Sequence, residues 1–213
     1  MLGVGPLTAA MTLWRWFEIP RAVASSHPIQ TSGCILIWGG STITGQIAIQ
    51  LCVQSGLEVI AVASKETSSL VESLGAAHAV ARDDKTDDEL VAAIKAIAGD
   101  SITRALDLVG GKVPALCLKV MSSDKPCLFA PLAMMSSSQE IPLNVKVVNV
   151  EMKQFVLDKS CMSYMTDLNS LVENDKLRLP QLEILYGGLG RVEEGLSRLK
   201  RGNMMGRKLV IEL

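Results

Sequence analysis

Short apolar runs alternate along this chain with longer segments in which apolar residues recur every three or four positions. Such runs are typical of buried strands, and the longer segments of amphipathic helices. The pattern predicts strands over residues 34–38, 59–63, 79–81, 104–109, 127–130, 145–150, 182–185 and 208–212. It predicts helices over residues 8–18, 44–55, 67–74, 86–98, 112–121, 164–174 and 192–201. This alternation predicts an α/β fold of the Rossmann type, a doubly wound parallel sheet with helices on both faces.

The same pattern suggests how the chain is organised. Residues 1–30 are expected to hold the first helix and part of a polar connection that runs over 21–33. Residues 31–213 are expected to form a Rossmann-like cofactor-binding domain, within which residues 131–180 have no clear period and are a candidate substrate pocket. Five methionines of that segment could line a soft apolar pocket or simply fill the core: Met134, Met135, Met152, Met162 and Met165.

Composition narrows the class of protein. The chain has 213 residues, 48% of them hydrophobic, which suffices for one well-buried domain. Its net charge is −1 and it has no long basic run, which argues against nucleic acid as a partner. Five irregularly spaced cysteines without a CxxC motif argue against a disulfide framework or a metal site, and favour reduced thiols in the cytoplasm.

Two apolar features could suggest a membrane or a secretory signal. No run of about 18 apolar residues exists, so no membrane span is expected. The apolar opening, Met1–Trp14, lacks the basic region of a signal peptide, and Arg15 and Glu18 follow it directly. We therefore interpret this opening as a helix of the folded domain.

A glycine-rich turn follows the strand at 34–38 and precedes the helix at 44–55. Its residues are Gly39, Gly40, Ser41, Thr42, Ile43, Thr44 and Gly45. The first two glycines allow a tight turn close to a pyrophosphate, and the last allows close packing of helix on strand. The three hydroxyls can donate to phosphate oxygens at the positive end of the helix. The turn predicts a dinucleotide site, although small residues could also serve packing alone.

The end of the second strand distinguishes NADP from NAD. An NAD site usually presents a carboxylate there, which binds the ribose hydroxyls. This chain has Ser64 and Lys65 instead, which can donate to a 2′-phosphate and neutralise it. The pair favours NADP(H), although Lys65 could also be a solvated lysine at the start of a helix.

The remaining polar residues do not predict a catalytic centre. His27 is expected at the surface, and His78 in a structural role. Tyr164 and Tyr186 could reach a pocket or cover the core. Asp107 could orient a ribose or cap the following helix. Because no nucleophile–base pair, carboxylate pair or metal-ligand spacing is present, the catalytic residues stay unknown.

A set of motifs in fixed order extends over nearly the whole chain. The motifs are Gly5–Ala10, Gly39–Leu51, Ser73–Ala76, Ala105–Gly111 and Gly206–Val210. With this set the chain resembles the medium-chain dehydrogenase/reductase superfamily, in its non-zinc branch. The form of its glycine turn is most similar to that of the fungal trans-acting enoyl reductases that serve polyketide synthases.

The resemblance implies roles for the matching positions. Residues 41–44 would hold the pyrophosphate, and Ser64 to Thr67 the 2′-phosphate. Residues near Gly3 to Thr8 would line the substrate side. Pro131 and Leu132 would contact the nicotinamide end of the cofactor. Met204 and Met205 would also approach the cofactor. One departure is Arg82-Asp83, where relatives often have Asp-Tyr; the carboxylate is expected to weaken NADP binding.

The resemblance implies NADPH-dependent reduction of an enoyl thioester, with a small-molecule or carrier-bound polyketide as substrate. Relatives begin with a GroES-like lobe that has no counterpart here, so we expect an enoyl reductase-like protein reduced to its cofactor domain. Its NADP(H) site would then be retained or vestigial. The alternatives are a redox-silent cyclase or isomerase of the pericyclase kind, and a non-catalytic partner of a synthase. An exposed apolar surface would also favour a synthase partner or self-association.

Overall fold

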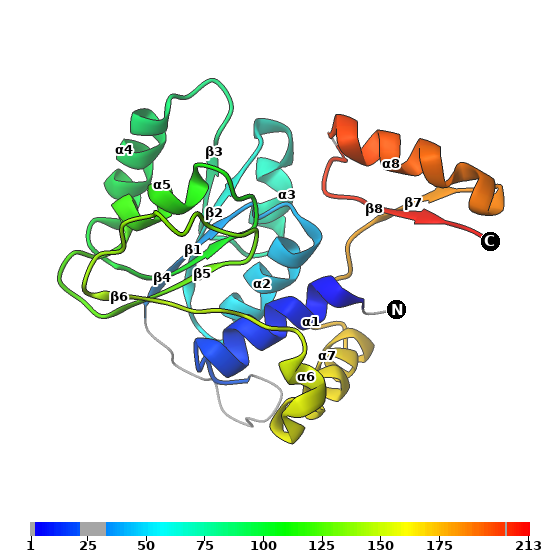
Figure 1. The fold of residues 1–213 in the computed structure, drawn as a ribbon, viewed down its shortest axis with the longest axis horizontal. Coiled ribbons are helices and arrows are strands. Elements are labelled where there is room, and N and C mark those ends of the chain that lie inside the picture. Colours follow the sequence, from blue (N-terminus) through cyan, green and yellow to red (C-terminus); the bar gives the residue numbers. More distant parts are fainter. Residues whose placement is uncertain (1–2, 22–32, 203) are drawn as a thin grey trace.

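Six parallel strands form the central sheet of the molecule (Figure 1). The computed structural model describes residues 3–21, 33–202 and 204–213. The strand order is β3-β2-β1-β4-β5-β6, and the winding reverses between β1 and β4, as in a doubly wound fold. The strands are β1 (Cys34–Trp38), β2 (Glu58–Ala63), β3 (His78–Ala81), β4 (Ile102–Asp107), β5 (Cys127–Pro131) and β6 (Val145–Val147). The fold class predicted from the alternation is confirmed.

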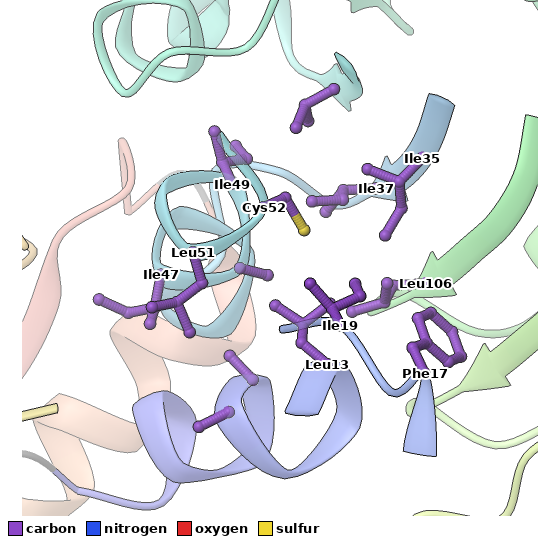
Figure 2. Close-up of a cluster of buried hydrophobic side chains, with 14 of the residues drawn as sticks. Leu13, Phe17, Ile19, Ile35, Ile37, Ile47, Ile49, Leu51, Cys52 and Leu106 are labelled. Carbon is purple, nitrogen blue, oxygen red and sulfur yellow. The ribbon is translucent and has the colours of Figure 1, made fainter. Parts of the chain in front are cut away.

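Each face of this sheet is covered by its own apolar core. Side chains alternate along a strand, so Ile35 and Ile37 of β1 enter one core, while Leu36 and Trp38 enter the other. The first core, part of which is drawn in Figure 2, also contains residues of six helical segments: α1 (Val4–Ala10), its π-helical continuation η1 (Met11–Trp16), α2 (Ile43–Gln54), α3 (Ser68–Ser73), the 3-10 turn η4 (Lys159–Cys161) and α7 (Ser163–Glu173). The second core is closed by α4 (Asp87–Ala98) and α5 (Val113–Val120).

The last two strands form a separate sheet of their own. β7 (Leu182–Leu185) and β8 (Lys208–Ile211) pair in parallel and do not join the main sheet, and Figure 1 shows them beside α8 (Val192–Arg201). Gly195 of α8 lies against this sheet, since a Cβ there would lie 3.3 Å from Cδ1 of Ile211. The sequence predicts both strands, but not that they leave the central sheet.

The N-terminal helix and the segment before α7 differ in detail from the prediction. The first helix begins at Val4 rather than at residue 8. Pro6 is compatible with this start, because the first turn of a helix needs no N–H donor from proline. Residues 22–32 of the predicted connection lie outside the described residues. Between β6 and α7 the structure adds two short helical elements, α6 (Gln154–Leu157) and the 3-10 turn η4 (Lys159–Cys161).

Neither a membrane span nor a disulfide is found in the described part of the chain. None of its helices is both long and apolar enough to cross a membrane. All five cysteines are buried and unbonded. Burial raises the pKa of the Cys34 thiol to about 11, so that thiol stays protonated and unreactive near neutral pH.

Candidate functional site

The glycine turn leaves β1 at the carboxyl edge of the sheet and passes close to β2. The N–H groups of Gly39 and Gly40 both donate to the carbonyl oxygen of Val62, at 2.9 and 3.0 Å. Gly39 has φ +89°, a left-handed conformation that favours glycine. A Cβ at Gly40 would lie only 2.9 Å from Cβ of Ala61. The two glycines therefore let the backbone turn tightly against its neighbouring strand.

Gly45 seats the first turn of α2 directly on the glycine turn. A Cβ at this position would lie 2.4 Å from the carbonyl oxygen of Gly39 and 2.8 Å from that of Gly40. Both obstacles are backbone atoms, which cannot swing away as a flexible side chain can. The close packing predicted for this glycine is thus a feature of the structure.

Thr42 caps α2 with its side chain. Its hydroxyl donates to the Gly39 carbonyl at 2.8 Å and accepts from the N–H of Gly45 at 3.1 Å. The hydroxyl proton is thereby used within the turn, and donation from Thr42 to a phosphate stays a prediction. The N–H groups of Ile43 and Thr44 belong to the first helical turn, where no carbonyl of the helix can accept them. These two N–H groups are among the donors that the turn leaves for an anion.

A groove runs from the glycine turn past the ends of β2 and β3, and we call it the dinucleotide groove. Its volume is about 570 Å³. It brings together seven of the predicted residues, from three separate parts of the chain: Ser41, Thr42, Ile43, Ser64, Thr67, Met204 and Met205. It also contains Glu66, which falls within the predicted range 64–67, and three charged residues that were not predicted as ligands: Arg82, Asp83 and Arg207. Arg207 lies in the C-terminal motif of the resemblance, which could have signalled it.

The end of β2 differs from its expected arrangement at one point. Ser64 and Thr67 do lie together, with 2.7 Å between their hydroxyl oxygens. The backbone N–H of Lys65, however, donates to the carboxylate of Asp83, and the Lys65 side chain does not line the groove. Asp83 therefore takes up a donor at the place where a 2′-phosphate was expected. The pairing of β2 with β3 brings the two residues together.

Gln46 fastens the C-terminal segment to the glycine turn. Its buried amide donates to the carbonyls of Ser41 at 2.8 Å and Gly206 at 2.6 Å. Gly206 has φ +73°, and a Cβ there would lie 2.5 Å from Cδ2 of Leu70. This link places the segment that contains Met204 and Met205 along the groove. Apart from the position of Gln46 inside the motif Gly39–Leu51, nothing in the sequence indicates this link.

A smaller cavity lies at the other end of the glycine turn. It has a volume of about 310 Å³ and contains Thr8, Thr44, Leu108 and Leu132. The N–H of Leu132 donates to the Asp107 carbonyl at 2.9 Å, and Pro131 pairs with Asp107 in the sheet register. Pro131 and Leu132 are thus held beside the carboxyl end of β4, and Leu132 lines the smaller cavity, whereas Met204 lines the dinucleotide groove.

Asp107 is held in a structural role. Its carboxylate accepts from the N–H groups of Val109 at 2.8 Å and Gly110 at 2.9 Å, and the residue is fully buried. Burial raises the pKa of the Asp107 carboxyl, and the hydrogen bonds from Gly110 and Val109 oppose that rise. The carboxylate thus holds the loop after β4, and no side chain caps the following helix α5, so the helix cap considered from the sequence is not what the structure shows.

The other polar candidates do not gather at the groove. His78 lies 3.3 Å from the carboxylate of Glu58 on the surface. Tyr164 packs edge-on against Trp14, with 5.3 Å between ring centroids, and Tyr186 is exposed. His27 lies outside the described residues. Within the described ranges no three His, Cys, Asp or Glu residues are placed to hold a metal.

The five methionines of residues 131–180 are dispersed rather than gathered in one pocket. Met134 and Met162 are exposed, by 82% and 64%. Met152 and Met165 pack against the first core, and Met135 against the second. Three of these methionines therefore pack against the two cores and two lie at the surface, so they do not line a common pocket.

Comparison with known proteins gives a consistent picture. The family model described as zinc-binding dehydrogenase matches residues 44–169, more than half of the chain. Among curated proteins, the trans-enoyl reductase himH of Aspergillus japonicus is 31% identical over 216 residues, covering 97% of this chain. The chain spans 59% of the length of that relative.

Two solved structures share the fold. The CurK enoyl reductase matches with a TM-score of 0.76 at 19% identity, over 99% of this chain and 60% of that one. The mycobacterial protein Rv1454c, solved with NADPH, matches with a TM-score of 0.65 at 16% identity, over 87% of this chain and 56% of that one. At these identities the matches show a common fold.

Proposed function

The chain belongs to the zinc-binding dehydrogenase family, within the medium-chain dehydrogenase/reductase superfamily, and on that basis we propose that it binds NADP(H) along the dinucleotide groove. The observation that supports this most is the pair of open N–H groups, of Ile43 and Thr44, at the N-terminus of a twelve-residue helix. They lie where the helix dipole favours negative charge. We assign the pyrophosphate to these donors and to the hydroxyl of Ser41.

The residues around the groove fit such a ligand. Arg82 and Arg207 add two cations, and the hydroxyls of Ser64 and Thr67 stand together at the end of β2. A volume of about 570 Å³ lies within the usual range for cofactor sites. Asp83 opposes a 2′-phosphate, so the preference for NADPH over NADH is expected to be small.

We further propose that the whole protein acts in enoyl reduction for polyketide biosynthesis, because its curated relative himH is named a trans-enoyl reductase. Bound NADPH would supply the hydride for an enoyl thioester. Thr44 and Leu132 of the smaller cavity would hold the nicotinamide end, and Gln46 would keep Met204 and Met205 against the cofactor. The proposal includes residues 31–213 as the cofactor-binding unit, a polyketide or carrier-bound substrate, a synthase partner and a cytoplasmic location.

The test combines the protein with NADPH and a short enoyl thioester, and follows the absorbance of the reduced nicotinamide. Loss of absorbance that depends on the thioester supports enoyl reduction. Turnover of a polyene substrate without cofactor would instead show a redox-silent cyclase or isomerase. Co-purification with a synthase, without NADPH binding or turnover, would show a non-catalytic partner, and either result would overturn the reductase proposal.

A further inference from the structure

A second groove, which we call the apolar groove, shares Ile43 with the dinucleotide groove. It lies between the N-terminal helix, the start of α2 and the sheet formed by β7 and β8. Its volume is about 540 Å³. Its lining is mainly aliphatic and comes from four parts of the chain, principally Pro6, Ile43, Leu179, Leu182 and Val210.

Lys208 is the one charged residue among the described residues that line this groove. Its ammonium lies beside the main chain of Gly3, since a Cβ built there would be 3.4 Å from Nζ. No carboxylate within the described ranges forms an ion pair with it. An aliphatic lining with a single free cation is complementary to a molecule with an apolar body and one negative charge.

The apolar surface continues from the groove along one face of β7. Leu185 points to α8, where it lies near Gly195, so Leu182 and Ile184 point to the opposite face. These two side chains are 58% and 41% exposed. A ligand can therefore be longer than the groove and still lie on aliphatic side chains, which favours an unbranched chain over a compact ring system.

We propose that the apolar groove binds a linear aliphatic carboxylate, with its hydrocarbon chain along Leu182 and Val210 and its carboxylate paired with Lys208. This site goes beyond the proposed dinucleotide binding and does not require NADP(H). Each methylene that enters the groove raises the affinity by at most about fourfold. Because Lys208 is partly exposed, its charge contributes about three- to fivefold in affinity.

Titration calorimetry of the intact chain with decanoate, octanoate and decanol tests the site. We expect decanoate to bind more tightly than both octanoate and decanol. Lys208→Gln is expected to reduce decanoate affinity to that of decanol and to leave decanol unchanged. Leu182→Asp, at an exposed position, is expected to weaken decanoate binding at least about tenfold, since it places a negative charge in the groove. The matched control is Lys200→Gln, an exposed lysine of α8 outside the groove, which should bind like the unaltered protein.

Three results would overturn the proposal: no decanoate binding, equal affinity for decanoate and decanol, or unchanged decanoate affinity in both the Lys208 and Leu182 variants. Circular dichroism of each variant verifies that it is folded. A parallel NADPH titration of the same samples separates this site from the dinucleotide groove. If decanoate does not bind but NADPH does, only the proposal for the apolar groove fails. If NADPH does not bind but decanoate does, only the proposed function fails.

Discussion

Replacing Gly45 with alanine tests whether the close seat of α2 shapes the anion site. The added Cβ would lie 2.4 Å from the Gly39 carbonyl oxygen, whereas close carbon–oxygen contacts in proteins begin at about 3.3 Å. The helix start and the turn must therefore separate by roughly 1 Å. Such overpacking costs about 1–3 kcal/mol, and the better helix propensity of alanine returns up to about 1 kcal/mol. We expect the free energy of unfolding to fall by about 1–2 kcal/mol.

Urea denaturation and calorimetric titration with NADPH measure the two consequences of Gly45→Ala. The separation also moves the N–H groups of Ile43 and Thr44, so we expect NADPH affinity to fall by about tenfold or more. Gly190→Ala is the matched control, because a Cβ at Gly190 meets no atom of the described residues within 4 Å. It should change stability by less than about 0.5 kcal/mol and leave NADPH affinity unchanged. Unaltered stability and NADPH affinity in Gly45→Ala would show that the close packing at Gly45 does not shape the anion site.

Three further substitutions test separate parts of the account. Thr86→Ala removes the capping box of α4 and should lower the free energy of unfolding by about 1 kcal/mol in urea denaturation, without changing NADPH affinity. Asp83→Asn should raise the affinity for NADPH about threefold to tenfold and leave that for NADH unchanged in calorimetry, whereas Asp84→Asn, outside the groove, should change neither. The hydrogen bond from Ser122 is the main cause that lowers the pKa of the Asp100 carboxyl. The ionised Asp100 carboxylate therefore stabilises the folded protein. This contribution is complete above the pKa of the carboxyl in the unfolded chain, about 4, and is lost as the pH falls through its lower pKa in the folded protein. Between about pH 5 and pH 2, Asp100→Asn should therefore lose less stability than the unaltered protein, measured by urea denaturation.

Much of the fold could be predicted because apolar runs mark buried strands directly. The run 34–38, for example, is buried throughout and is the central strand β1. The strands with which a given strand pairs are harder to predict, because hydrophobic periodicity identifies a strand but does not say which other strand lies beside it. In the described part of the chain Leu182–Leu185 pairs only with Lys208–Ile211, and nothing in the sequence of either segment indicates that the pair lies outside the central sheet.

The candidate site was likewise predicted in part. The glycines could be interpreted from their spacing, because tight turns and close helix packing need them at fixed positions. The hydrogen-bond partner of each hydroxyl could not be predicted. From the sequence alone, the Thr42 hydroxyl can donate either to a backbone carbonyl of the turn or to a phosphate, and only the three-dimensional structure of the turn distinguishes the two. Asp83 was noted in the sequence, but its bond to the Lys65 N–H depends on the register of β2 and β3.

The glycine turn and the dinucleotide groove are proposed to form an NADP(H) site. Calorimetric titration of the intact chain with NADPH, NADP and NADH measures it directly. We predict measurable binding of NADPH, with a somewhat weaker affinity for NADH because Ser64, Arg82 and Arg207 outweigh the single charge of Asp83 at the 2′-phosphate. Absence of measurable binding for all three nucleotides would contradict the account.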